Sequence, residues 1–174
     1  EWIGIYHDQK DYAVCFGVEP EIWQKAEDNQ YVPETSLTDT EIRMPGGHLT
    51  ITQLIALLNT IPMEITFVDV DNINRFFNEG PKDFKRPGMA IDREVFSCHP
   101  PKIESTVRRI IGEFRAGALD EVPIWMDKNG KCMLVKYMAV RDKEGKYLGT
   151  LELVQDMGFA KEHFQPEKRQ EEIW

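Results

Sequence analysis

The chain has 174 residues, of which 41% are hydrophobic, and its formal net charge is −9. This size and composition suit one compact domain with extra segments and exclude a chain that is disordered throughout. The negative charge would repel a nucleic acid backbone, and no apolar run approaches the roughly 20 residues of a membrane-spanning helix, so we expect neither nucleic acid nor a membrane as a partner.

The first 45 residues are predicted to be an adjunct to the main domain. Residues 2–7 and 12–18 have the pattern of two short strands around a turn, which indicates a β-hairpin. Residues 24–45 are polar and lack a clear period, so they are predicted to be a linker. Because the chain opens without a methionine, we expect it to be a fragment of a longer protein, with residues 1–45 preceding the main domain at 46–157.

Residues 49–62 predict a helix with a well-defined start. Thr50 as N-cap and Gln53 have the spacing of a capping box, and Leu49 with Leu54 has that of a hydrophobic staple. Pro62 limits the far end of the helix. The dense apolar content requires the helix to bury most of one side, either against a sheet or against a second copy of itself.

The middle of the chain predicts two short strands, a broken segment and a second helix. Residues 64–69 and 73–78 are β-rich and flank an Asp71-Asn72 turn. Prolines and a glycine then interrupt residues 81–96, which are predicted to be short helical turns and loops. Residues 101–117 form the second helix, whose apolar side chains recur at spacings of three and four: Ile103, Val107, Ile110, Ile111 and Phe114.

The remainder of the domain is predicted to be an antiparallel meander. Three β-rich runs cover residues 120–126, 131–140 and 146–155, and the turns DKNG and DKEG join them. Each turn ends in glycine, as tight hairpin turns prefer. Residues 158–174 are charged and interrupted by Pro166, so this C-terminal tail is either a frayed helix or an output connection.

This order of elements implies an α+β fold with a five-stranded antiparallel sheet, short helices and one long helix on one face, preceded by the N-terminal hairpin and linker. Residues 48–156 resemble a PAS sensor domain, through ITFVDVDNINRFFN, DREVFSCHPPKIESTVRRII and MAVRDKEGKYLGTLELVQD. They are most similar to the PAS subgroup found behind a hemerythrin-like domain in bacterial proteins of unknown function. The family often has glycine where Asp92 stands.

The resemblance implies a sensory module that binds a small molecule or cofactor and passes the signal to attached domains, with a hemerythrin-like domain upstream. We expect the ligand between the sheet and the helix at 101–117. The expected pocket wall consists of Ile65, Phe67, Phe76, Ile103, Val107, Tyr137 and Leu151. The alternative is a ligand-free dimerisation module, in which the helix at 50–59 pairs with its twin in a homodimer.

His99, in the stretch SCHPPK, is a candidate haem ligand. It directly precedes the helix at 101–117, whose N-terminus disfavours a charged imidazolium, and neutral imidazole is the form that binds iron. Met133 is the candidate for a second ligand, which would make the domain a haem-based redox or gas sensor. The favoured interpretation is that this histidine belongs to an ordinary helix start, and the cofactor stays unknown.

The three cysteines are widely spaced and contain no CxxC pair, which favours a reducing, cytoplasmic setting over a disulfide framework. One of them, Cys98, lies near a helix start, where a thiol can be redox-sensitive, although a buried and inert thiol is the favoured interpretation. The chain has no GxGxxG, P-loop or GxSxG motif. We therefore expect a protein that is not an enzyme.

Overall fold

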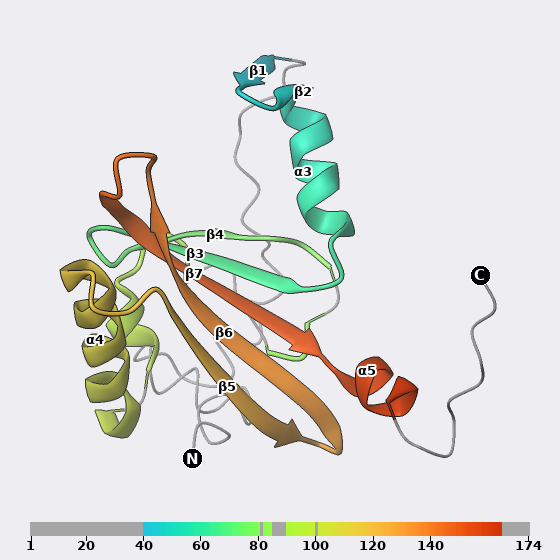
Figure 1. The fold of residues 1–174 in the computed structure, drawn as a ribbon, viewed down its shortest axis with the longest axis vertical. Coiled ribbons are helices and arrows are strands. Elements are labelled where there is room, and N and C mark those ends of the chain that lie inside the picture. Colours follow the sequence, from blue (N-terminus) through green and yellow to red (C-terminus); the bar gives the residue numbers. More distant parts are fainter. Residues whose placement is uncertain (1–39, 81, 85–89, 100, 165–174) are drawn as a thin grey trace, which may run out of the picture.

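A computed structural model describes residues 40–80, 82–84, 90–99 and 101–164 (Figure 1). The hairpin predicted at residues 2–18 and most of the predicted linker lie outside these residues.

One antiparallel sheet of five strands organises the domain, and its strand order is β4-β3-β7-β6-β5. The strands are β3 (Glu64–Asp69), β4 (Asn74–Phe77), β5 (Glu121–Lys128), β6 (Lys131–Arg141) and β7 (Tyr147–Asp156). The central strand β7 pairs with β3 on one side and with β6 on the other. The hairpin of β6 and β7 therefore lies beside the hairpin of β3 and β4, and the predicted α+β architecture is confirmed.

Tight turns join the strands where the sequence predicts them. Asn72 has a positive φ of 66° between β3 and β4, and Asn129 and Gly130 have φ values of 54° and 81° between β5 and β6. Between β6 and β7, the Asp142 carboxylate accepts hydrogen bonds from the backbone N–H groups of Glu144 (3.0 Å) and Lys146 (2.8 Å). These local contacts explain why each turn forms at its own residues.

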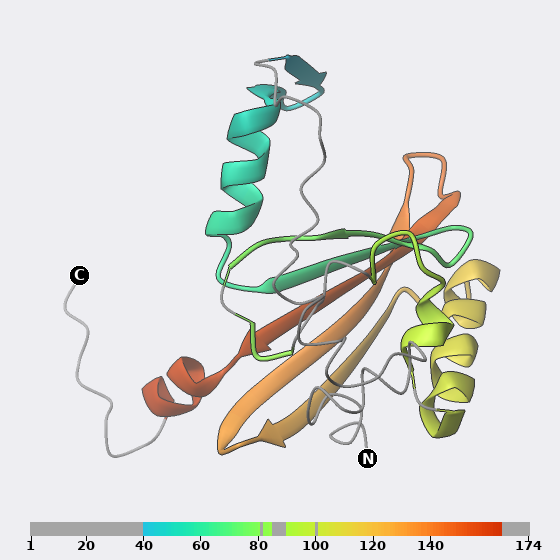
Figure 2. The same ribbon diagram turned by 180° about the vertical axis from the view of Figure 1, so that it is seen from behind.

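The long helix α4 (Pro101–Ala116) covers one face of the sheet, which we call the inner face (Figures 1 and 2). A short 3-10 helix, η3 (Val95–Cys98), leads into it. Gly117, with φ 73°, follows its last residue, as expected for a helix stop. The predicted apolar stripe of α4 is buried throughout, at Ile103, Val107, Ile110, Ile111 and Phe114.

Helix α3 (Ile51–Thr60) begins with the predicted capping box. The Gln53 N–H donates to Thr50 Oγ1 at 3.1 Å, and the Thr50 N–H donates to Gln53 Oε1 at 2.9 Å. No residue of α3 is buried, and the helix projects beyond the sheet in both views (Figures 1 and 2). Helix α3 therefore does not bury a side against the sheet, and its burial against a second copy stays a prediction.

The two remaining strands precede α3, where the sequence predicts the end of a linker and the start of a helix. β1 (Glu41–Met44) and β2 (Gly47–Thr50) pair as a hairpin. Residues 41–44 are thus a strand, because Pro45 and Gly46 supply a turn that lets the chain reverse at once. The domain boundary at residue 46 stays a prediction.

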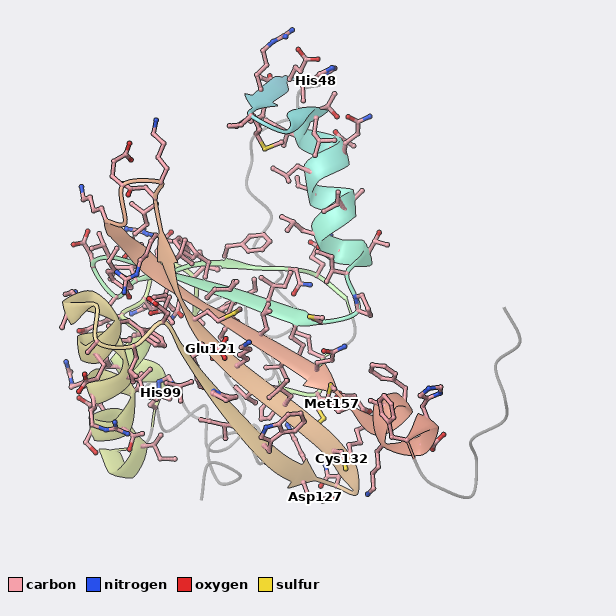
Figure 3. All side chains as sticks on the ribbon, in the orientation of Figure 1. His48, His99, Glu121, Asp127, Cys132 and Met157 are labelled. Atoms are coloured by element: carbon pink, nitrogen blue, oxygen red, sulfur yellow. The ribbon has the colours of Figure 1, made fainter. Side chains whose placement is uncertain are left out.

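The chain beyond β7 continues into a short helix, α5 (Gly158–His163), in the predicted tail. Asp156 Oδ1 accepts from the Gly158 N–H at 2.8 Å, and the Met157 N–H donates to the Cys132 carbonyl at 2.6 Å. Figure 3 shows Cys132 and Met157 close together beside α5. These bonds attach the start of α5 to the end of the sheet.

Asp92 stands in a left-handed conformation, with φ 61°. Its carboxylate accepts from Arg75 Nη1 at 2.6 Å, and Arg75 Nε also pairs with Asp69 Oδ2 at 2.5 Å. Aspartate tolerates this conformation better than most residues. The turn is therefore kept without glycine, and the ion pairs tie it to β3.

Candidate functional site between the sheet and α4

The inner face of the sheet carries buried polar side chains opposite α4. Thr66 on β3 is 5% exposed, and Thr150 and Glu152 on β7 are 4% and 9% exposed. Thr66 lies directly across from Glu152, and Val68 lies across from Thr150. Burial of polar groups costs free energy unless they are hydrogen-bonded, and the Thr150 hydroxyl of this polar patch lies 2.7 Å from the Tyr147 hydroxyl.

A cavity of about 20 Å³ lies between this polar patch and α4. Its lining comes from β3, η3, α4, β6 and β7, and consists of Val68, Val95, His99, Val107, Ile110, Ile111, Tyr137, Thr150 and Glu152. A water molecule requires roughly 10–15 Å³ measured in this way. The cavity therefore has room for one or two waters. It combines an apolar wall with an imidazole, two hydroxyl groups and a carboxylate.

His99 closes the cavity at the start of α4 and is 7% exposed. It lies between α4 and the sheet (Figure 3). Its ring Nδ1 is 2.7 Å from the Val95 carbonyl oxygen, which can only accept, so Nδ1 carries the proton. In the neutral ring, Nε2 is then an acceptor. His99 has the extended conformation predicted for a residue before proline, with φ −119° and ψ 137°.

A chain of contacts connects the cavity wall with the C-terminal end of α4. The Thr150 hydroxyl is 2.7 Å from the Tyr147 hydroxyl, and the Arg115 guanidinium lies 5.7 Å from the centre of the Tyr147 ring. Arg115 donates to the Val70 carbonyl at 2.8 Å, and Arg141 donates to the Phe114 carbonyl at 2.7 Å. The end of α4 is thereby attached to the β3–β4 turn and to β6.

The structure places the predicted wall residues on both faces of the sheet. Val107 and Tyr137 line the cavity, whereas Ile103 is buried in the same apolar cluster as Val107 without lining the cavity. The other four lie on the outer face: Ile65, Phe67, Phe76 and Leu151. A ligand in the cavity would contact Val107 and Tyr137, and it would lie across the sheet from these four.

The sequence reasoning missed Thr150 and Glu152, because hydrophobic alternation in β7 points to Leu151 and Leu153 as the inward residues. The reason is an irregular register in the hairpin of β6 and β7. A register shift between Val140 and Arg141 places Tyr137 opposite Glu152. Without this bulge, counting back from the turn would place Tyr137 opposite Leu151. A one-residue shift exchanges the two faces of a strand, and no signal in the sequence marks it.

The cavity as it stands has no room for a haem group, and haem ligation by His99 and Met133 stays a prediction. The cavity of about 20 Å³ is far below the roughly 300 Å³ or more of pockets for larger ligands. Met133 is 1% exposed and packs in the cluster around Phe114, away from the cavity lining. Among the described residues, no group of three or more His, Cys, Asp or Glu side chains could hold a metal ion. The side chain of Cys98 lies outside the part that the structure describes.

No helix in the described ranges is both long and apolar enough to cross a bilayer.

Comparisons with known proteins agree on the fold. A family model described as a PAS domain matches residues 54–158, more than half of the chain. The crystal structure of a C-terminal domain from Streptococcus mutans is similar at 37% identity, with a TM-score of 0.67, and the match covers 71% of this chain and 97% of that one. No curated protein matches the chain.

Two more distant structures are also similar. A PAS domain from Colwellia psychrerythraea has 14% identity and a TM-score of 0.45, over 61% of this chain and 95% of that one. A sensory box sensor histidine kinase from Vibrio cholerae has 12% identity and a TM-score of 0.42, over 59% and 88%. The match of the family model and the architecture of the sheet together establish that the chain belongs to the PAS domain family.

Proposed function

We propose that this PAS domain is a cytoplasmic sensory module that binds a small molecule between α4 and the inner face of the sheet. The observation that carries the proposal is the polar patch around the cavity. β3 and β7 bury Thr66, Thr150 and Glu152 inward, while apolar side chains of the same strands face outward. A core selected for stability alone would place the apolar side chains inward and the polar ones outward. The observed pattern therefore supports recognition of a ligand.

The small volume of the cavity supports a signalling mechanism. A ligand larger than one or two waters has to displace α4 from the sheet, because the cavity offers no further room. Arg115 and Arg141 attach the end of α4 to the β3–β4 turn and to β6. A displacement of α4 therefore changes these contacts, and the module passes the change to attached segments without catalysis.

A ligand screen tests the proposal. Wild-type protein is screened for thermal stabilisation by small molecules, and each hit is measured by titration calorimetry. Val107→Phe places a ring in the cavity and is expected to abolish binding, whereas Val70→Phe, at a position that is 45% exposed, is expected to leave binding unchanged. Circular dichroism verifies that both variants are folded. Hits that bind both variants equally would show that the ligand site lies elsewhere.

We also propose that a hemerythrin-like domain precedes this PAS domain in the full-length protein. The support is the resemblance of three segments to the PAS subgroup found behind such domains. Iron analysis of the full-length gene product tests it. A di-iron content of about two ions per chain in the full-length product, and none in residues 40–164 alone, is expected. An iron-free full-length protein after reconstitution would contradict the proposal.

A further inference from the structure

The lining of the cavity contains an acidic side chain but no strongly basic one. Among the described residues that line it, Glu152 is the only acidic residue, and none is lysine or arginine. Glu152 lies on the central strand β7 and is 9% exposed. The carboxylate therefore determines which charge on a ligand head group the cavity accepts.

Hydroxyl-bearing residues flank Glu152 on the inner face. Tyr137 of β6 lies directly across from Glu152 on one side, and Thr66 of β3 lies directly across on the other. Residues paired in this way have Cβ atoms roughly 4.5–5.5 Å apart. Thr150 lies two residues earlier on β7 and shares the same face. A hydroxyl can donate or accept a hydrogen bond, so these residues can adapt to the head group of a ligand.

The acceptor positions of the lining favour a ligand that donates hydrogen bonds. A carboxylate such as that of Glu152 only accepts. The His99 ring uses its Nδ1 proton for the Val95 carbonyl, 2.7 Å away, so Nε2 of the neutral ring is an acceptor as well. A primary amide or an ammonium group carries two or three N–H donors, whereas a carboxylate head group carries none. The polar part of the cavity thus matches an N–H donor.

The rest of the lining is aliphatic and branched, and its members come from β3, η3 and α4: Val68, Val95, Val107, Ile110 and Ile111. The volume of about 20 Å³ holds one or two waters. A ligand of a few non-hydrogen atoms therefore enters with the smallest displacement of α4. Its apolar part is expected to be a short aliphatic group that packs among these side chains.

We propose that Glu152 makes the cavity selective for short aliphatic ligands whose head group donates N–H hydrogen bonds and carries no negative charge. The inference rests on the proposed function, because it names the class of ligand for the same site. The head group donates to the Glu152 carboxylate, while the aliphatic group lies against α4. A carboxylate head group is rejected, because two negative charges repel each other strongly where little water screens them.

Three small probes with one branched aliphatic group test the proposal: isobutylamine, isobutyramide and isobutyrate. Each is titrated into the full 174-residue chain, and the NMR signals of the Ile110 and Ile111 methyl groups report binding in the cavity. The amine and the amide are expected to bind about tenfold or more tightly than isobutyrate. This comparison uses the wild-type protein and does not depend on the folding of a variant.

Glu152→Gln replaces one carboxylate oxygen by an N–H donor of the same size, and it is expected to narrow the preference to about threefold or less. Glu144→Gln is the matched control. Its side chain is 66% exposed in the turn between β6 and β7, and the preference is expected to stay unchanged. Circular dichroism verifies that both variants are folded.

The outcomes separate this proposal from the proposed function. Wild-type protein that binds isobutyrate within about threefold of isobutyramide, or a preference that Glu152→Gln leaves intact, would overturn the ligand class. The proposed function would survive either result if Val107→Phe abolished binding of the same probes. Methyl signals that respond to none of the three probes would also overturn the ligand class, and the broader ligand screen would still decide the proposed function.

Discussion

Gly149→Ala is expected to destabilise the domain strongly, because a Cβ atom at this residue of β7 would collide with β3. A Cβ atom at position 149 would lie 2.2 Å from the Val68 carbonyl oxygen and 2.8 Å from two carbons of the Phe67 ring. The first distance is more than 1 Å below the 3.4 Å at which ordinary contacts begin. Backbone has to move, since the atom in contact is a carbonyl oxygen in the centre of the sheet.

The expected loss of unfolding free energy in Gly149→Ala has two contributions. Overpacking a close-packed site costs about 1–3 kcal/mol, and weakening a neighbouring ladder hydrogen bond costs about 1 kcal/mol. We therefore expect the free energy of unfolding to fall by about 3 kcal/mol, a large part of the roughly 5–15 kcal/mol of a typical domain. The melting temperature is expected to fall by roughly 10 °C. Urea unfolding followed by circular dichroism measures both the midpoint and the free energy.

Gly112→Ala is the matched control. Gly112 lies on the exposed side of α4, and a Cβ atom there would meet nothing within 4 Å. The same substitution is expected to raise stability by about 0.5–1 kcal/mol, because alanine favours helix more than glycine does. A Gly149→Ala variant within about 0.5 kcal/mol of the wild type would refute the reasoning.

Three further predictions concern the core and its acidic groups. Val107→Ile adds a methylene beside the cavity and is expected to stabilise the domain by up to about 0.8 kcal/mol. Val154→Ile, in a filled cluster, is expected to destabilise it by about 1 kcal/mol or more. Thermal unfolding in which both variants shift the melting temperature equally would contradict the placement of the cavity. Asn78→Ala removes the side chain that bonds the backbone at Leu58, Met63 and Ile65, and urea titration is expected to show a loss of about 2–4 kcal/mol. Burial raises the pKa of Asp69, but hydrogen bonds from Ile73, Arg75 and Asp71 and the charge of Arg75 outweigh it and hold the pKa below its usual value. As pH falls, the unfolded chain therefore takes up a proton at Asp69 before the folded chain does. This stabilisation is present above about pH 4 and is lost as pH falls toward the folded-state pKa. Asp69→Asn is expected to flatten the dependence of the urea midpoint on pH in that range.

The sequence by itself determined the elements whose signals are local. The capping box of Thr50 and Gln53, the apolar stripe of α4 and the turn at Asn129-Gly130 each depend on residues a few positions apart. Such signals act between neighbouring residues and need no contact with a distant segment. Such local signals were sufficient for the α+β architecture, whereas the resemblance to the family depended on three longer sequence segments.

Only the tertiary structure decided which face of each strand meets α4. A strand reverses its faces when its register shifts by one residue, and the bulge at Val140 and Arg141 is set by how β6 and β7 pack together. The exposed position of α3 is likewise set by distant partners, since Asn78 and Glu79 hold its end. Alternation and spacing describe a chain segment, whereas the candidate site depends on contacts between segments that lie far apart in the sequence.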